Sequence, residues 1–480
     1  METIQPVSHE TFIQPGAFSS YTTEQWKTHI RYLQEVGFQT IIIQWSCVTK
    51  ENRIISAFYP CRVIQYLSED YREVDVIGKL LQACAALKMH VRMGLNNPDE
   101  WFSFVFSDMK WCRKEAEIGI AVARDIYEQY FETFHDVLVG WYFVPEYFNG
   151  MKNAEGAAEL LNRYLDGLDD LNSSLPLMLS PFLRAFVSPE ETRNEWIDIF
   201  QKTHFRRGDI FCCQDSVGAG WIGMFQLPYY FSALREAVDT KPELRFWANN
   251  EDFTQDGGTA RLVRFIRQME ISRPYVEDYV TFSYDHYWSP DFVNPKHHEQ
   301  YLRYFQTGHL DVEQYEEPMA IPVERQLLTR GCSYTGFQNT RGDEWDDDGV
   351  KLTNGIVPSA DGSSPSYSAC KHHHLTITVD LGKRSPINEI GLYLTFGNWG
   401  VALPSCTIFS VSENGMEWKP FGEVSSDRLR PVAQEKGWFQ MYFGFQDKEG
   451  AKARYLRYEI CGSGALWLGQ LCAYFYKTGM

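Results

Sequence analysis

Two glutamates stand at the ends of apolar segments, where their carboxyl groups could cleave a glycosidic bond. Glu146 follows VLVGWYFVP, and Glu251 follows LRFWANN. Glycoside hydrolysis needs one carboxylic acid to protonate the leaving oxygen and a second carboxylate to attack the sugar or to activate water. Asp215 and Asp285 close two further apolar segments in the same way. A carboxylate in such a place can also cap a helix, so the elements around it decide between the two roles.

The elements that carry these residues follow a regular order. Up to about residue 310, short apolar runs alternate with segments of helical period, which predicts β/α units around a parallel sheet. The eight expected strands cover residues 11–14, 40–45, 90–95, 137–146, 175–181, 209–215, 244–251 and 279–285. Eight strands and eight helices match a (β/α)8 TIM barrel in number and size. A doubly wound open sheet is the alternative, but no glycine fingerprint follows the first strand.

The barrel would bring the two glutamates together. Active sites of such barrels are built where strands end and the following loops begin. Strands four and seven face each other across the mouth, so Glu146 and Glu251 can flank a bound sugar. A retaining mechanism needs carboxyl groups about 5 to 5.5 Å apart, and an inverting one needs roughly 6.5 to 9.5 Å.

Aromatic and polar side chains near the same strand ends could shape a sugar cleft, because a pyranose packs its apolar face on an aromatic ring. The candidates are Gln44, Trp45, Tyr59, Trp101, Tyr142, Gln214, Asp215, Trp247, Asn249, Asp285, His286 and Tyr287. The period-2 pleat places Tyr142 and Trp247 on the same face as the glutamates and turns Trp141 toward the helices. His286 could bond a sugar hydroxyl or a carboxylate, or serve the structure alone.

Composition excludes several classes of partner. The 63 acidic and 45 basic residues give a formal charge of -18, which disfavours nucleic acid and anionic membranes as partners. METIQPVSHE has no signal-peptide pattern and no long apolar run appears, so we expect a cytoplasmic protein, or a secreted one if a signal has been removed. The 11 cysteines form no CxxC pair and are expected to be reduced and buried. In KHHHL, neighbouring strand residues would point to opposite faces, which disfavours a metal site.

The character of the chain changes beyond the barrel. Glu and Pro cluster in DVEQYEEPMAIPVE, and helical period is lost. We therefore divide the chain into a barrel at 1–312, a linker at 313–327 and a second domain at 328–480. Short alternating strands separated by turns such as Asn414-Gly415 predict that the second domain is an antiparallel β-sandwich.

The barrel region resembles the clan A glycoside hydrolases, retaining enzymes whose acid/base glutamate ends the fourth strand and whose nucleophilic glutamate ends the seventh. The resemblance implies that Glu146 is the acid/base, that Glu251 is the nucleophile and that catalysis needs no cofactor. Pro145 stands where that clan usually has an asparagine that binds the sugar 2-hydroxyl, a contact that Asn249 or Gln214 could make instead. FIQPGAFSSYTTEQWKTHIRYLQEVGFQTIIIQW, GWYFVPE, QDSVG and FSYDHYWSP are similar to a group of bacterial glycoside-hydrolase-like barrels catalogued as of unknown function.

The second domain resembles discoidin-type, coagulation-factor C-terminal modules in DDDGVKLTNG, TITVDLGK, VSENGMEWKPFGEV and ARYLRYEICG. This implies a galactose-binding-like jelly roll, which could bind carbohydrate or complete the barrel. In such modules a loop often holds a structural calcium, for which Asp348 and Thr353 are the candidates here. Asn354 and Gln470 stand where aspartate and glutamate are common, so fewer charges would face the ion.

Together these patterns predict a glycoside hydrolase acting on an oligosaccharide or glycoside. A non-catalytic carbohydrate-binding barrel is the alternative, because Pro145 replaces the expected asparagine. A lyase or a metal-assisted hydrolase that uses Asp215, Asp285 and His286 is a third interpretation.

Overall fold

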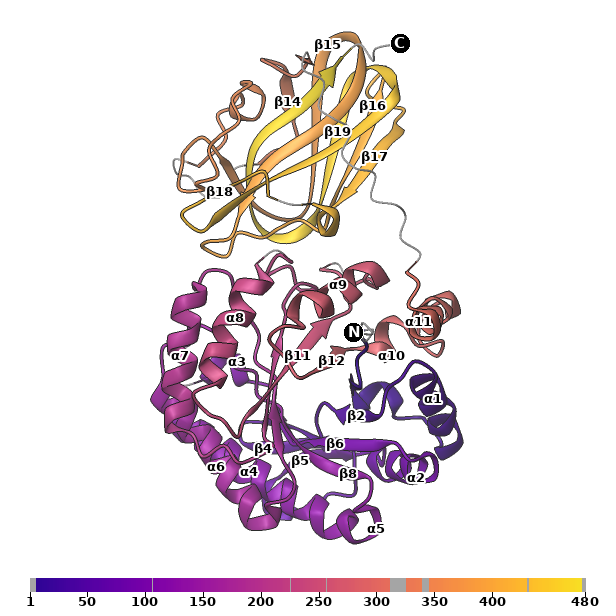
Figure 1. Cartoon of the computed structure of the whole chain (residues 1–480), viewed down its shortest axis with the longest axis vertical. Coiled ribbons are helices and arrows are strands. Elements are labelled where there is room, and N and C mark those ends of the chain that lie inside the picture. The colour runs from indigo at the N-terminus through magenta and orange to yellow at the C-terminus, as the bar shows by residue number, and fades with distance from the viewer. Residues whose placement is uncertain are drawn as a thin grey trace.

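The N-terminal domain is a closed barrel of eight parallel strands (Figure 1). The computed structural model describes residues 6–105, 107–224, 226–255, 257–310, 325–338, 345–429 and 431–476. The barrel strands are β1 (Glu10–Ile13), β2 (Thr40–Ile43), β6 (His90–Gly94), β8 (Leu138–Phe143), β9 (Leu177–Leu179), β10 (Ile210–Gln214), β11 (Arg245–Glu251) and β12 (Asp278–Phe282). Each overlaps a predicted strand, which confirms the TIM-barrel prediction and excludes the open sheet.

Helices connect the strands and cover the outside of the barrel (Figure 1). They are α1 (Thr23–Glu35), α2 (Ile77–Leu87), α3 (Trp101–Phe104), α4 (Met109–Ile126), α5 (Glu132–Phe134), α6 (Ala154–Asn172), α7 (Pro189–Lys202), α8 (Leu227–Val238), α9 (Leu262–Ser272), α10 (Tyr284–Tyr287) and α11 (Pro295–Thr307). Thr22 and Gln25 form a reciprocal capping box before α1, and Ser188 and Glu191 form another before α7. These caps satisfy backbone N–H groups that the first helical turn leaves unpaired.

One excursion interrupts the alternation of strands and helices. The chain forms a four-stranded sheet of β5 (Leu67–Glu73), β4 (Arg53–Ala57), β3 (Cys47–Lys50) and β7 (Asn96–Pro98), which lies outside the barrel path. This sheet was not predicted from the sequence. Its strands are short and mostly half-buried, so they carry neither the apolar runs of barrel strands nor a helical period.

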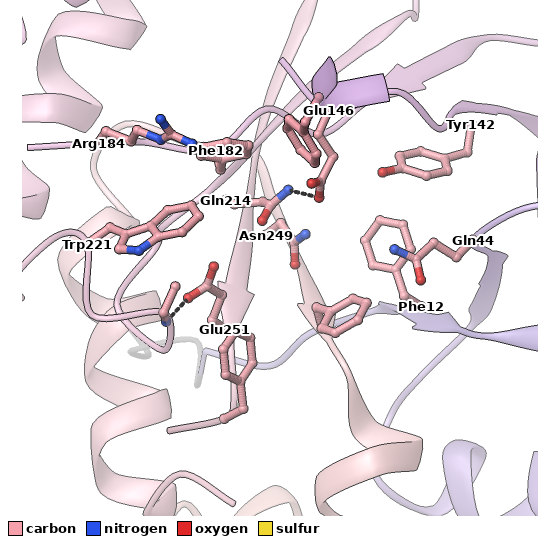
Figure 2. Close-up of a pocket in the computed structure, with 14 residues that line it drawn as sticks. Phe12, Gln44, Tyr142, Glu146, Phe182, Arg184, Gln214, Trp221, Asn249 and Glu251 are labelled. Atoms are coloured by element: carbon pink, nitrogen blue, oxygen red, sulfur yellow. Dashed lines mark hydrogen bonds between the residues drawn. The ribbon is translucent and has the colours of Figure 1, made fainter. Parts of the chain in front are cut away.

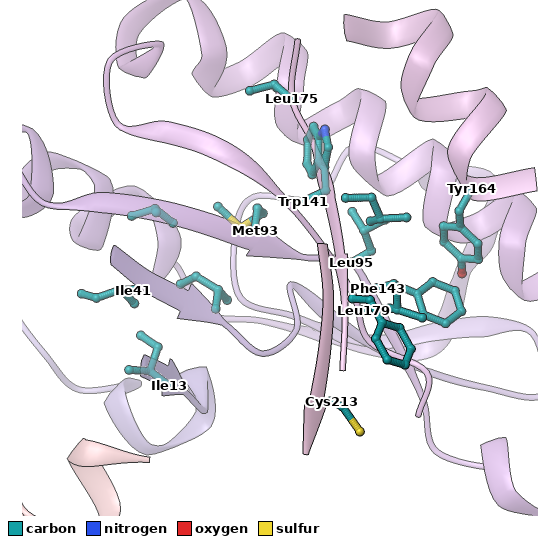
Figure 3. Close-up of a cluster of buried hydrophobic side chains, with 14 of the residues drawn as sticks. Ile13, Ile41, Met93, Leu95, Trp141, Phe143, Tyr164, Leu175, Leu179 and Cys213 are labelled. Atoms are coloured by element: carbon teal, nitrogen blue, oxygen red, sulfur yellow. The ribbon is translucent and has the colours of Figure 1, made fainter. Parts of the chain in front are cut away.

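The main core lies between the strands and the helices (Figure 3). Alternate strand residues point outward into it, including Ile13, Ile41, Met93, Trp141 and Phe143. Trp141 therefore faces the helices, as the pleat predicts. Burial of both faces of each parallel strand explains why these strands appear in the sequence as nearly continuous apolar runs.

The barrel interior contains a buried ion pair near the starts of the strands. Glu10 on β1 accepts two hydrogen bonds from Arg92 on β6, at 3.1 and 2.9 Å. A Cβ at Gly140 on β8 would come within 2.4 Å of the Arg92 guanidinium, so only glycine leaves room for it there. Above this pair, inward side chains such as Phe12, Tyr142 and Trp247 fill the barrel and support the site above them.

The C-terminal domain is an antiparallel β-sandwich with its own apolar core. Its strands are β13 (Gln326–Leu327), β14 (Ser333–Thr335), β15 (Ser368–Phe396), β16 (Cys406–Ser412), β17 (Lys419–Ser425), β18 (Ala433–Glu435) and β19 (Trp438–Phe475). The second half of β15 lies between two parts of β19, because Leu392 pairs with both Phe443 and Leu471. The long strands thus bend and pair with each other repeatedly.

The sandwich lies beside the barrel on the side of α9 (Figure 1). Arg261, directly before α9, donates to Asp427 of the sandwich at 2.6 Å. Most of the predicted linker, residues 313–327, falls outside the described residues. Within the described parts of the chain, no helix is both long and apolar enough to cross a membrane.

Candidate active site

A cavity of about 340 Å³ opens where the barrel strands end (Figure 2). It is lined by Phe12, Gln44, Phe102, Tyr142, Glu146, Phe182, Arg184, Gln214, Ala219, Trp221, Asn249, Glu251, Phe253 and Phe282. Figure 2 shows the two glutamates reaching this space from different strands, with Trp221 and Arg184 on one side of it and Tyr142 and Gln44 on the other. The volume lies at the lower end of the usual range for small-molecule sites, which is about 300 to 1,000 Å³.

Glu146 lies just beyond β8, and its neighbours fix its position. Its Oε1 accepts a hydrogen bond of 3.0 Å from the Gln214 side-chain amide, which also donates to the Ser180 carbonyl at 2.8 Å. The Trp101 indole donates to the Glu146 carbonyl oxygen at 2.8 Å and stacks on Tyr147. Burial raises the pKa of the Glu146 carboxyl, and the Gln214 hydrogen bond opposes that rise.

Glu251 is the last residue of β11, and the residue is only 4% exposed. Its Oε2 accepts a hydrogen bond of 2.7 Å from the backbone N–H of Ala219. A Cβ on the adjacent Gly218 would come within 2.8 Å of the Glu251 Cβ, so the chain can approach this closely only at a glycine. Burial, and next the nearby charge of Asp215, raise the pKa of Glu251 to about 8.

Asp215 stands behind Glu251, on the helix side of the sheet. One carboxylate oxygen accepts from the backbone N–H groups of Val217 and Glu251, at 3.1 and 3.3 Å. The other accepts from the side-chain amides of Asn250 and Gln268, at 2.8 and 2.6 Å. Asp215 therefore ties together β10, β11 and α9 and does not line the cavity.

Six of the sequence-predicted residues lie together in the cavity: Gln44, Tyr142, Glu146, Gln214, Asn249 and Glu251. Tyr142 contributes a ring that packs edge-on against Phe12. The Asn249 amide donates to the Ser180 hydroxyl at 3.0 Å, while its buried carbonyl oxygen has no hydrogen-bond partner among the described residues. That oxygen is free to accept a hydrogen bond from a sugar hydroxyl.

The structure corrects the placement of four predicted aromatic residues. Tyr59 is fully buried, donates to Cys61 in the excursion and does not line the cavity. Trp101 supports Glu146 from behind, as described above, rather than lining the cavity. Trp45 and Trp247 belong to the apolar packing of the barrel interior. Composition and spacing could not distinguish these packing rings from sugar-binding ones.

Asp215, Asp285, His286 and Tyr287 also lie outside the cavity lining. The eighth strand ends at Phe282, so Asp285 is fully buried in the short helix α10 instead of ending a strand. His286 Nδ1 bonds the Ser283 hydroxyl at 2.9 Å, and the Tyr287 ring stacks on Phe253. The eighth strand thus ends three residues earlier than we predicted.

The aromatic and cationic side of the cavity was not predicted from the sequence. Phe182, Arg184 and Trp221 come from the loops after β9 and β10, and the rings of Phe182 and Trp221 lie 4.9 Å apart. Phe102 lies on α3, and Phe282 is the last residue of β12. Phe182 and Phe282 stand at or near strand ends, whereas Arg184 and Trp221 lie further along their loops.

The calcium candidates have other contacts. Asp348 accepts from the backbone N–H groups of Val350 and Lys351, at 2.9 and 2.8 Å. The Thr353 hydroxyl donates to the Cys332 carbonyl at 2.7 Å. Among the described residues, no three or more His, Cys, Asp or Glu side chains are grouped so that they could hold a metal ion.

Comparison with models of protein families assigns the chain to a family. The model described as a domain of unknown function, DUF4434, matches residues 10–294, which include the barrel and both glutamates. The chain belongs to the DUF4434 family. No curated protein matches it.

Solved structures resemble this chain in parts. A protein from Bacteroides thetaiotaomicron VPI-5482, described as a "putative alpha-L-fucosidase", is 19% identical, with a TM-score of 0.53; the match covers 64% of this chain and 97% of that one. A GH29 fucosidase from Ruminococcus gnavus, solved with fucose, is 10% identical over 98% of this chain and 93% of its own, with a TM-score of 0.35. The lectin domain of lectinolysin, solved with Lewis B antigen, is 17% identical over 32% of this chain and 98% of its own, with a TM-score of 0.24. The first of these likenesses shows the barrel fold.

Proposed function

We propose that this DUF4434 protein is a glycoside hydrolase whose reaction takes place between Glu146 and Glu251. The observation that carries the proposal is that two carboxyl groups from the fourth and seventh barrel strands line one cavity. Aromatic rings complete the cavity, as a site for the apolar face of a sugar requires. The fold likeness to a protein described as a fucosidase supports the same reaction class.

The hydrogen bonds favour Glu251 as the proton donor. All four donors that surround Asp215 are N–H groups, so its two oxygens act only as acceptors. These hydrogen bonds stabilise the ionised form of the Asp215 carboxyl. A second negative charge beside it, in a buried site, is costly, which keeps the proton on Glu251. Glu251 would then protonate the glycosidic oxygen, and Glu146 would act as the carboxylate that attacks the sugar or activates water.

This division reverses the one implied by the resemblance to clan A, in which Glu146 is the acid/base and Glu251 the nucleophile. The two divisions use the same pair of residues and the same cavity. They differ in which carboxyl holds the proton before reaction, and the environment of Asp215 favours Glu251.

The cavity suits a small sugar unit. Its volume of about 340 Å³ accommodates one or two sugar rings. The Asn249 carbonyl oxygen is placed to accept from a sugar hydroxyl, the contact that Pro145 cannot make. The solved neighbours add α-L-fucosides to the substrates that should be tried.

A non-catalytic sugar-binding barrel is the second candidate function. Pro145, buried beside Glu146, is the observation that favours it, because the expected asparagine is absent. Such a protein would bind a sugar in the cavity and release it unchanged.

Turnover of a panel of 4-nitrophenyl glycosides, α-L-fucoside and uronides included, tests the proposal. We expect Glu146→Gln to lower kcat/KM by about 10² to 10⁴-fold, and Glu251→Gln to lower it by less, because 4-nitrophenolate leaves with little help from an acid. Circular dichroism should be unchanged in both variants. Glu159→Gln, a surface substitution on α6, is the matched control and should keep full activity. Sugar binding without cleavage of any glycoside would favour the binding protein instead.

A further inference from the structure

Arg184 brings a positive charge to the cavity that holds the two glutamates. It follows β9 by a few residues, and its side chain is half-buried among aromatic rings. The guanidinium lies 4.5 Å from the ring centre of Phe148, 5.1 Å from Phe182 and 5.3 Å from Trp221. Figure 2 shows Arg184 and Trp221 on the same side of the space that the glutamates face.

The guanidinium has no acidic partner among the described residues, unlike those of three other barrel arginines. Arg92 pairs with Glu10, Arg206 with Asp209, and Arg261 with Asp427. For Arg184, burial alone lowers the pKa, and no carboxylate opposes that shift. The surrounding rings stabilise the cation through their faces but accept no conventional hydrogen bond from its N–H groups.

A half-buried guanidinium with free N–H groups is suited to a planar or tetrahedral oxyanion. Its fork of donors matches two oxygens of a carboxylate or sulfate, and such charge-assisted bonds are about twice as strong as bonds to a neutral hydroxyl. The overall charge of -18 would repel an anionic ligand, so a local cation is needed to retain one.

We propose that Arg184 selects an acidic sugar, one that carries a carboxylate or a sulfate ester, for the cavity of Glu146 and Glu251. The proposal rests on the proposed function, because it assigns the substrate class of the same site. The anionic group binds Arg184, and the sugar ring extends toward the two carboxyl groups. Arg184 is thus a specificity-determining residue.

Binding of free monosaccharides, measured by isothermal titration calorimetry on the full chain, tests this without any turnover. The probes are D-glucuronate, D-galacturonate and D-galactose 6-sulfate, each compared with D-glucose, D-galactose and L-fucose. We expect at least one acidic probe to bind about 10- to 100-fold more tightly than its neutral counterpart. Added salt should weaken that acidic probe alone.

Arg184→Gln should abolish the preference, whereas Arg184→Lys, which keeps the charge and loses the fork, should retain part of it. Arg193→Gln, which removes a surface arginine that pairs with Glu236 on α8, is the control and should change nothing. Thermal unfolding of each variant shows whether the protein is still folded, and Arg184→Lys keeps the test informative if Arg184→Gln does not fold.

The outcomes separate the two proposals. Preference for uronates assigns a carboxylate, and preference for the sulfated sugar assigns a sulfate ester. Equal affinity for acidic and neutral sugars in the wild type, or equal losses for both in Arg184→Gln, would overturn the role of Arg184. Acidic sugars that bind through Arg184 while no glycoside is cleaved would leave this inference standing and overturn the hydrolase. Cleavage of neutral glycosides with no binding of acidic sugars would do the reverse.

Discussion

At the scale of single residues, the site depends on where one proton lies. Glu251 and Asp215 are both buried at the end of neighbouring strands, and burial raises the pKa of each. Asp215 accepts four hydrogen bonds, whereas the Glu251 carboxylate accepts one from Ala219. This difference, rather than position on the barrel, is why Glu251 is favoured as the acid.

The pH profile should follow this proton. Activity that needs protonated Glu251 is lost as the pH rises through its pKa of about 8. Asp215→Asn removes the neighbouring negative charge and so lowers the pKa of Glu251. We therefore expect the alkaline limb of kcat/KM to move to lower pH, with a loss of about 1–3 kcal/mol in the free energy of unfolding from the broken hydrogen bonds.

Asp209→Asn is the matched control for Asp215→Asn. Asp209 is equally buried and also accepts backbone N–H groups, from Leu177 and Arg206, but it precedes β10 at the opposite end of the strand. The Asp209→Asn variant should lose stability, but the alkaline limb of its kcat/KM profile should stay in place. An alkaline limb that stays in place in a folded Asp215→Asn variant would contradict the role of Asp215.

At the scale of elements, residues 217–222 form a wall between two cavities. Ala219 and Trp221 line the cavity with the glutamates. Val217, Gly218, Gly220 and Ile222 line a second cavity, of about 500 Å³, that the sandwich closes with residues such as Ser405 and Asp427. The segment that donates to Glu251 is therefore bounded by the sandwich on its other side.

The contact between Arg261 and Asp427 should help to hold residues 217–222 in position. Asp427→Asn breaks an ion pair worth at most about 1 kcal/mol, so we expect KM for a glycoside to rise up to about 5-fold while kcat stays within about 2-fold. Steady-state kinetics measure both constants. Asp380→Asn, which breaks the pair with Arg454 inside the sandwich, should leave KM unchanged. A similar KM change in both variants, or none in Asp427→Asn, would show that the contact does not act on the site.

The sequence predicted the strands better than the loops, for a physical reason. Parallel strands buried on both faces appear as apolar runs, so Glu146 and Glu251 could be located at strand ends. Arg184 and Trp221 lie on loops, where no period indicates which side chain turns inward. Tyr59 was misplaced because the excursion sheet buries it, and Asp285 because the eighth strand stops at Phe282.

At the scale of the whole molecule, the barrel supplies the carboxyl pair and the sandwich encloses the outer side of one cavity wall. The sandwich also carries Trp399, which is 57% exposed and lies edge-on to Trp345. An exposed ring of this kind is what a sugar-binding role for the sandwich requires. The division into a barrel at 1–312 and a sandwich at 328–480 remains our proposal. The contact between Arg261 and Asp427 joins these two domains.

The dependence on the leaving group tests the central claim most directly. The 2,4-dinitrophenolate group of an aryl glycoside departs without being protonated, whereas the alcohol of an alkyl glycoside leaves only when the enzyme protonates the glycosidic oxygen. For Glu251→Gln we predict that the glycosidic bond of the dinitrophenyl substrate is cleaved at a near-wild-type rate. On the alkyl substrate the rate of cleavage should fall by about 10² to 10⁴-fold. Glu146→Gln should lose both activities to that extent. Near-wild-type cleavage of both substrates by both variants would contradict the assignment of this carboxyl pair as the catalytic groups.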